Sequence, residues 1–471
     1  MPASDLLFTP VRQLAALLRA RKLSPVELTR ACLDRIEALN PRVNAFLTVT
    51  ADHALAQARA AEKEIAAGRY RGPLHGIPYA PKDICATKGI RTTNGSRVTE
   101  NWVPDYESAA TERLHRAGAI LLGKLNLLEF AMGSGQTGLN GPARNPWDLA
   151  YSPSGSSSGS GAAIAAGMAP LTIGTDSGGS IRGPAKSCGV VGLKPTYGLV
   201  SRYGVTTLSW TLDHVGPMAK SVAAVASMLQ VMAGYDRRDE ASANLPVPDY
   251  AKSLTGNCKG LRIGVPTEHY FTHVHPDTQA ALDQARAVLK DLGAVEVNIA
   301  VRNAALCGPT SATILSSEAA AFHEQRLKQH AAQFDPLVRE RLEAATFHTA
   351  VDYIKALRIR TMLMEEMNRI FQSCDVILLP AGNAPPKIEG EIAVTDLPTN
   401  PPAPPRPDAF NLANVTGIPA IVLPCGFTPG PPVLPLGIQF CARPFGEPKL
   451  FQVAQAYESA TNWHTRTAPL A

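Results

Sequence analysis

The sequence predicts an α/β protein in which a β-sheet is covered on both faces by α-helices. From Gly72 onward, short apolar runs separated by Gly, Pro, Ser and Thr alternate with segments of helical pattern. Such alternation is typical of a sheet buried under helices. Of the 471 residues, 45% are apolar and 18% are charged. This is the balance of a folded globular chain and the opposite of a disordered one.

The first 70 residues are predicted to be helical. Thr9 and Pro10 suit an N-cap followed by a proline in the first turn, and apolar residues recur behind them at helical spacing. Residues 24–27 read Ser-Pro-Val-Glu, a capping box that begins a second helix. Residues 40–41, Asn-Pro, are expected to stop that helix. The Ala-rich residues 51–67 predict a third helix.

The remaining elements are predicted in chain order from apolar runs and helical periodicity. Strands are expected at residues 119–122, 171–174, 261–265, 376–379 and 418–422. Helices are expected at residues 108–117, 161–166, 276–292 and most of 317–373. The proline-rich stretch 398–407 is expected to be an extended surface loop, with a recognition segment as the alternative.

Charge and hydropathy exclude several classes of protein. The net charge of +5 is spread over the chain without a run of five Lys or Arg, so we expect no nucleic-acid partner. No stretch of 18 apolar residues predicts a membrane span, and the N-terminus lacks the pattern of a secretory signal. The eight cysteines are scattered without a CxxC, which favours reduced, buried thiols and a cytoplasmic location.

The Ser/Gly-rich segment 152–161 is open to several interpretations. A flexible linker is one, but residues 162–166 follow at once as a compact small-residue helix that must pack closely. A nucleophile elbow at residues 155–159 would need a preceding strand, which the Pro-containing sequence before it does not supply. A phosphate-binding loop would need a closing Lys-Ser or Lys-Thr.

The surrounding motifs favour a fourth interpretation. They are Gly76-Ile-Pro-Tyr-Ala-Pro-Lys82-Asp83, Gly123-Lys124, Asn145-Pro-Trp-Asp148, Gly174-Thr-Asp-Ser-Gly-Gly-Ser180-Ile-Arg182, Cys188-Gly-Val-Val-Gly-Leu-Lys-Pro-Thr196 and Asn414-Val-Thr-Gly-Ile-Pro419. With these motifs the chain resembles the amidase signature family over nearly its whole length. The resemblance implies one large domain, residues 1–471, with a helical segment 1–70, a signature core 72–200 and a mixed, mostly parallel twisted sheet.

The family hydrolyses amides with a Ser–cis-Ser–Lys triad. The resemblance places the nucleophile at Ser180, the bridging serine at Ser156 and the base at Lys82. A serine hydroxyl needs a neighbouring base, and no histidine lies in either glycine-rich segment. Lys82 can accept a proton only when neutral, so its pKa, ordinarily about 10.4, must be lowered by burial.

The turn before Ser180 offers backbone donors for an oxyanion hole. Ser177, Gly178 and Gly179 present consecutive N–H groups with little side-chain obstruction. An ordinary tight turn is the alternative. The resemblance also implies that Asp176 and Arg182 brace this turn through an ion pair.

The resemblance implies two substrate-binding residues, Met132 and Gly133, with a core methionine beside a turn as the alternative. His269, His273 and His275 form the only histidine cluster, and a loop-like setting favours exposed side chains over a zinc site. The predicted mechanism needs no metal and no cofactor.

The main functional hypothesis is an amidase that cleaves amides, aryl amides or carbamates (urethanes), and also esters, through an acyl-enzyme. Its expected partner is a small-molecule substrate, with no nucleic acid and no membrane, and the expected state is a monomer or homodimer. The alternative is the A subunit of a glutamine-dependent tRNA amidotransferase. Ser311-Ala312 stands where such subunits carry a substrate-binding tyrosine, and Gly446 stands where acidic residues are common in them. These two departures argue against this alternative, although Arg360 stands where such subunits have a glutamine-binding arginine. A catalytically inactive binding scaffold is a third hypothesis.

Overall fold

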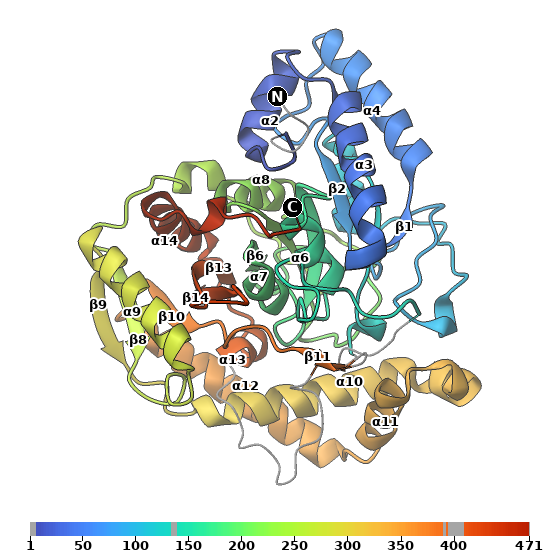
Figure 1. Cartoon of the computed structure of the whole chain (residues 1–471). Coiled ribbons are helices and arrows are strands. Elements are labelled where there is room, and N and C mark those ends of the chain that lie inside the picture. The colour runs from blue at the N-terminus through green and yellow to red at the C-terminus, as the bar shows by residue number, and fades with distance from the viewer. Residues whose placement is uncertain (1–5, 133–138, 390–391, 394–408, 471) are drawn as a thin grey trace.

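A ten-stranded mixed sheet forms the centre of the computed structural model, which describes residues 6–132, 139–389, 392–393 and 409–470 (Figure 1). The strand order is β3-β2-β5-β7-β6-β13-β14-β10-β8-β9. The strands are β2 Pro78–Pro81, β3 Ile120–Leu121, β5 Leu171–Asp176, β6 Val191–Lys194, β7 His214–Ala219, β8 Arg262–Pro266, β9 Val295–Ile299, β10 Val376–Pro380, β13 Ala420–Phe427 and β14 Pro435–Ala442. Parallel pairs lie at the two flanks, in β3-β2-β5 and β10-β8-β9, and antiparallel pairs join the strands between.

Helices surround the sheet, and two groups stand out in Figure 1. The helices are α2 Val11–Arg19, α3 Pro25–Val43, α4 Ala51–Ala66, α5 Ala109–Arg116, α6 Ser158–Ala165, α7 Arg182–Cys188, α8 Val222–Met232, α9 Pro276–Asp291, α10 Cys307–His330, α11 Pro336–Ala345, α12 Ala350–Ile370, α13 Ala409–Val415 and α14 Glu447–Ala460. Helices α2 to α4 gather at one end of the molecule, and α10 to α12 form a layer along the opposite side. Two short ribbons, β1 Phe46–Val49 with β4 Gly123–Leu125 and β11 Ile388–Glu389 with β12 Ile392–Ala393, lie outside the main sheet.

Both faces of the sheet are covered, as β13 shows. Ile421 and Leu423 belong to the hydrophobic cluster that includes residues of α8 and α14. Val422, between them, belongs to the cluster that includes Ile164 of α6 and Ala185 of α7. Successive side chains of a strand point to opposite faces, so helices pack on both sides. The predicted α/β fold is confirmed. Because one sheet takes strands from both halves of the chain, we propose that residues 1–471 form one domain.

Helix α3 begins where the sequence predicts and ends later than predicted. Ser24 is its N-cap, and its Oγ accepts hydrogen bonds from the N–H groups of Val26 and Glu27. The prediction that Asn40-Pro41 stops the helix is wrong, because α3 continues to Val43. A proline within the last turn removes one N–H donor without preventing closure. The helix ends instead at Asn44, which has φ 52° and donates its N–H to Asn40 O.

Helix α6 follows the Ser/Gly-rich segment, and all eight of its residues are buried. Gly159 has no room for a side chain, because a Cβ there would lie 2.4 Å from Ala45 O. The linker interpretation is therefore wrong, and the glycines permit close packing. The eight cysteines are free and buried, as predicted. The proline-rich stretch 398–407 lies outside the described residues.

Candidate active site

Lys82 leaves the sheet at the carboxyl end of β2. Strand β2 pairs in parallel with β5, with Pro81 opposite Ile173, so Lys82 and Thr175 emerge at the same edge of the sheet. The Lys82 side chain has no exposed surface. Its Nζ donates to Ser156 Oγ at 2.7 Å and to Thr175 Oγ1 at 2.8 Å. Burial lowers the pKa of Lys82 to about 7 and outweighs the carboxylates nearby.

A buried ion pair holds the segment that carries Lys82. The next residue, Asp83, lies 3.1 Å from Lys124 Nζ, and neither side chain is exposed. Asp83 also accepts from the N–H and the hydroxyl of Thr93, and Lys124 donates to Cys85 O and Thr92 Oγ1. These contacts satisfy both charges and fix the backbone on either side of the lysine.

Ser156 stands just before α6 and is almost fully buried. The Gly155–Ser156 peptide bond is cis, as the resemblance implies. The following residue, Ser157, is the N-cap of α6, and its Oγ donates to Thr175 O at 3.1 Å. The start of α6 is thereby tied to the end of β5, next to Lys82.

Ser180 lies in the turn between β5 and α7 and is half-buried. Its carbonyl oxygen accepts the N–H of Ser157 at 3.3 Å. The structure thus joins the segments of all three predicted catalytic residues: Lys82 contacts Ser156 directly, and Ser180 is joined to the residue that follows Ser156. Their catalytic roles remain proposals.

A buried ion pair braces this turn, as predicted. Asp176 at the end of β5 accepts from Arg182 Nε and Nη2, both at 3.0 Å, and also from Asn414 Nδ2. Burial alone would raise the pKa of Asp176, but the Arg182 guanidinium outweighs burial and holds that pKa well below its usual range. The guanidinium also donates to Gln439 Oε1 and stacks on the ring of Phe410.

The same carboxylate engages one of the proposed oxyanion donors. The N–H of Gly179 donates to Asp176 Oδ1 at 2.7 Å. The Gly179 N–H can donate to an oxyanion only if it is shared with Asp176. The proposed oxyanion hole therefore depends mainly on the N–H groups of Ser177 and Gly178. Gly179 has φ +114°, and a Cβ there would lie 2.7 Å from the ring of Phe410. Only glycine suits that conformation and that contact.

Ser180 opens on a cavity of about 440 Å³. It is lined by Ala131, Met132, Ser177, Gly178, Ser180, Leu208, Ala312, Leu315, Ser316, Arg341, Ala344, Ala345 and His348. Met132 lines this cavity, and its carbonyl accepts from Arg341 Nη1 at 2.9 Å. Its substrate-binding role stays a prediction. The second predicted residue, Gly133, lies outside the described residues.

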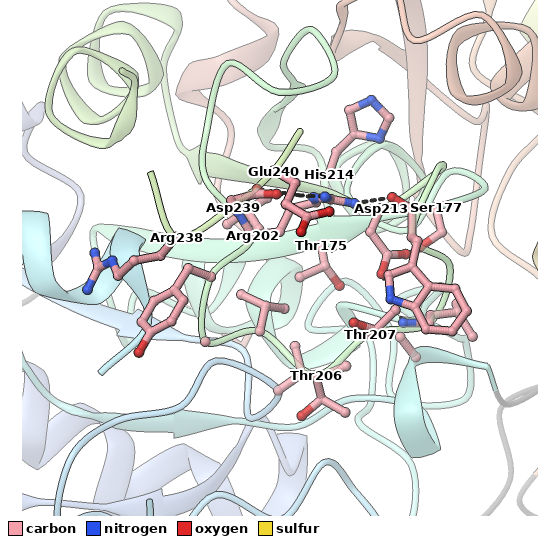
Figure 2. A pocket seen from close by; sticks show the side chains of 18 residues that line it. Thr175, Ser177, Arg202, Thr206, Thr207, Asp213, His214, Arg238, Asp239 and Glu240 are labelled. Atoms are coloured by element: carbon pink, nitrogen blue, oxygen red, sulfur yellow. Dashed lines mark hydrogen bonds and ion pairs between the residues drawn. The ribbon is translucent and has the colours of Figure 1, made fainter. Parts of the chain in front are cut away.

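A second cavity, of about 420 Å³, is also lined by Ser177 (Figure 2). Thr175 lines it, and so does Asp213, which accepts from Ser177 Oγ at 2.5 Å and from the N–H groups of Leu208 and Ser209. Burial raises the pKa of Asp213 to about 6. Sequence reasoning missed Thr175 and Asp213, because a threonine in an apolar strand and an aspartate in a loop carry no motif of their own.

The other candidates lie apart from the Ser180 cavity. His275 caps α9, and within the described ranges no group of three or more His, Cys, Asp or Glu side chains is placed to hold a metal ion. Arg360 donates to Thr211 O at 2.9 Å, and Gly446 is the N-cap of α14. None of the helices in the described part of the chain is long and apolar enough to cross a membrane.

Comparison with known proteins identifies the family. A family model described as Amidase matches residues 27–451. The chain belongs to the amidase signature family. It is 43% identical to the A subunit of the glutamyl-tRNA(Gln) amidotransferase of Geobacter metallireducens over 484 residues, which cover 97% of this chain and 98% of that protein.

Two solved structures are similar over nearly the whole chain. One is the native peptide amidase from Stenotrophomonas maltophilia, with 33% identity, a TM-score of 0.85, and coverage of 96% of this chain and 97% of that chain. The other comes from a vestigial protein complex that reveals the origins of an s-triazine catabolic enzyme, with 31% identity, a TM-score of 0.89, and coverage of 98% and 100%. This chain is thus an amidase signature enzyme that acts on a C–N bond, as a hydrolase or as an amidotransferase.

The comparisons correct the partner prediction. The sequence predicts a small-molecule substrate, no nucleic acid and no partner beyond a second copy. The relatives from Geobacter metallireducens and Chloroflexus aurantiacus are subunits of an enzyme named for glutamyl-tRNA(Gln), which contradicts that prediction. Runs of Lys and Arg along the chain are a poor guide to nucleic-acid binding, because a folded surface brings together charges from distant segments. The relatives favour the alternative hypothesis over the main one.

Proposed function

We propose that this chain is the A subunit of a glutamine-dependent tRNA amidotransferase and releases ammonia from the side-chain amide of glutamine. The 43% identity to such a protein, over nearly the full length of both chains, supports the assignment. The observation that carries the chemistry is the hydrogen bond from the buried Lys82 Nζ to Ser156 Oγ. A lysine with a pKa of about 7 is largely neutral in mildly alkaline solution and can act as a general base.

The proposed reaction proceeds in two halves. Ser180 Oγ attacks the amide carbonyl while its proton passes to Ser156 and the Ser156 proton passes to Lys82. The N–H groups of Ser177 and Gly178 stabilise the oxyanion. The C–N bond then breaks, and the nitrogen takes a proton back through Ser156 and leaves as ammonia. Water attacks the acyl-enzyme by the same route, and glutamate and free Ser180 are released.

One observation favours a second candidate, an amidase that works without partner subunits. Apolar side chains form much of the described lining of the Ser180 cavity, among them Leu208, Ala312, Leu315 and Ala344. This lining suits a substrate with an apolar acyl group, as would a peptide amide or an aryl amide. Carbamates and esters present a carbonyl of the same geometry, so we include them under this second candidate.

Steady-state kinetics distinguishes the two candidates. The purified chain is assayed against L-glutamine and against a hydrophobic primary amide, with the partner subunits and glutamyl-tRNA(Gln) absent and then present. The first candidate predicts that glutamine hydrolysis rises at least tenfold when the partners and tRNA are added. If the chain alone hydrolyses the hydrophobic amide with a kcat/KM at least a hundredfold above that for glutamine, and the additions change nothing, the second candidate is correct. The Ser180→Ala variant is the control for both.

A further inference from the structure

A third cavity, of about 730 Å³, opens beside the one in Figure 2 and has no role in the proposed reaction. Residues 204–207 line both cavities, and Thr206 and Thr207 are labelled in Figure 2. The other walls come from segments far apart in the sequence: residues 97–102 with Tyr106, Phe322 and Arg326 in the second half of α10, and Gln333. Its volume lies within the range of cavities that hold small ligands.

Aromatic rings line this cavity. Trp102, Tyr106 and Phe322 belong to its wall. The ring centroids of Trp102 and Tyr106 lie 6.2 Å apart, and those of Tyr106 and Tyr203 lie 6.0 Å apart. Tyr106 is 40% exposed and Trp102 is partly exposed, so both rings are accessible to solvent. An exposed aromatic surface of this kind is suited to stack on a planar base.

Two arginines, Arg97 and Arg326, belong to the same wall. Neither Arg97 nor Arg326 forms an ion pair or a side-chain hydrogen bond with any residue that the structure describes, and the Arg326 guanidinium lies 4.9 Å from the centroid of the Phe322 ring. In the neighbouring cavity, by contrast, Arg202 is paired with Asp239 and Arg238 with Asp236. Glu100 is the one described carboxylate in the wall of the third cavity, which leaves a net positive charge there.

We propose that this cavity binds a nucleotide, with the base stacked on Trp102 and Tyr106 and the phosphate bound by Arg97 and Arg326. Arginine binds phosphate oxygens through its forked N–H groups, and stacking on aromatic rings holds any base. The same chemistry has two sources, a free nucleotide and the terminal nucleotide of an RNA. The RNA source rests on the proposed A-subunit function, and the free nucleotide does not.

Calorimetric titration of the Ser180→Ala protein with adenosine 5′-monophosphate tests the proposal. Binding to this variant is independent of turnover, so a failure here is separate from a failure of the proposed function. We expect saturable binding, and at least tenfold weaker binding of adenosine alone and of inorganic phosphate alone. If adenosine 5′-monophosphate does not bind at millimolar concentration, or phosphate alone binds as tightly, the proposal is wrong.

Amino-acid substitutions test whether the nucleotide binds in this cavity. On the Ser180→Ala background, Arg97→Ala with Arg326→Gln should weaken nucleotide binding at least tenfold, while Arg91→Ala, an exposed arginine outside the cavity, should leave it within twofold. Trp102→Ala should weaken binding about tenfold and Trp102→Phe less, because a phenyl ring still stacks. Thermal unfolding of each variant confirms that it is folded. Binding that survives both the arginine pair and Trp102→Ala would overturn the assignment of this cavity.

RNA hairpins distinguish the two sources. A hairpin with the single-stranded 3′ end CCA is compared with the same hairpin without its terminal adenosine. Tenfold tighter binding of the full hairpin than of adenosine 5′-monophosphate, lost with the terminal adenosine, indicates the end of a tRNA. Equal or weaker binding of the hairpin indicates a free nucleotide, and the cavity assignment then stands without the tRNA.

Discussion

Lys82 Nζ lies 2.7 Å from Ser156 Oγ in a site where the lysine side chain has no exposed surface. Burial makes the charged ammonium form of Lys82 costly and therefore favours the neutral amine. The sequence motifs point to both residues, but only the fold brings them together. Strand β2 pairs in parallel with β5, and Ser157, the residue after Ser156, is hydrogen-bonded to Thr175 at the end of β5. The position of the base and its lowered pKa therefore have one structural origin.

The pH dependence of activity follows from Lys82. Because burial lowers its pKa to about 7 and only the neutral amine accepts a proton, kcat/KM should rise between pH 6 and 8 and level off above pH 8. An ordinary lysine, with a pKa of about 10.4, would give a rise that continues to pH 10. A pH profile with a neutral amide substrate measures this, and a rise that continues to pH 10 would contradict the burial argument.

Thr175 is expected to position the base. Its hydroxyl accepts a hydrogen bond from Lys82 Nζ at 2.8 Å, which favours the charged form of the lysine. Thr175→Val should lower kcat/KM about tenfold, or ~1.4 kcal/mol, and move the apparent pKa of the profile downward. Thr172→Val is the matched control, because Thr172 lies on the same strand and its hydroxyl donates to Ser160 O and has no hydrogen bond to Lys82. An unchanged pH profile of kcat/KM in Thr175→Val would show that the hydrogen bond between Lys82 and Thr175 does not affect the base.

The Asp176–Arg182 pair should matter for stability. Arg182→Met leaves a fully buried carboxylate without its cation, which costs about 3–5 kcal/mol of unfolding free energy. The double variant Asp176→Asn, Arg182→Met should recover part of that loss, because it removes both charges of the pair. Urea unfolding of the single and double variants measures both values. Additive losses in the double variant would show that the two side chains are not coupled.

Ala312 should limit the size of the acyl group. It lines the Ser180 cavity from α10, so Ala312→Phe should lower kcat/KM for a bulky aryl amide at least tenfold and leave acetamide within about threefold. Ala321→Phe, exposed on the same helix outside this cavity, should affect neither substrate. Equal losses of kcat/KM for both amides would show that the acyl group does not bind beside Ala312.

The parts of the fold that sequence predicts are those in which local pattern agrees with tertiary packing. Apolar runs predict strands β5, β8 and β10, and periodicity predicts α9. Strand β2 was missed, because Pro78 and Pro81 stand at its ends and proline usually marks a loop or a strand edge. It is a short strand between β3 and β5, and nothing in four residues reveals that pairing.

The candidate site divides in the same way. Motifs single out Lys82, Ser156 and Ser180, because nucleophile and base chemistry restricts residue types. The Thr175 hydroxyl and the Asp213 carboxylate were not predicted, since their significance lies in contacts between segments distant in the sequence. The Gly179 N–H is engaged by Asp176, a contact that spacing alone does not disclose.

Ser180 is the proposed nucleophile of a Ser–Ser–Lys site. A fluorophosphonate probe followed by peptide mass spectrometry tests it most directly. We expect one adduct, on Ser180, formed faster at pH 8 than at pH 6 and absent from Ser180→Ala. That variant should also lose at least a thousandfold in kcat. An adduct on Ser156 or another residue with Ser180 unmodified, or substantial turnover by Ser180→Ala, would contradict it.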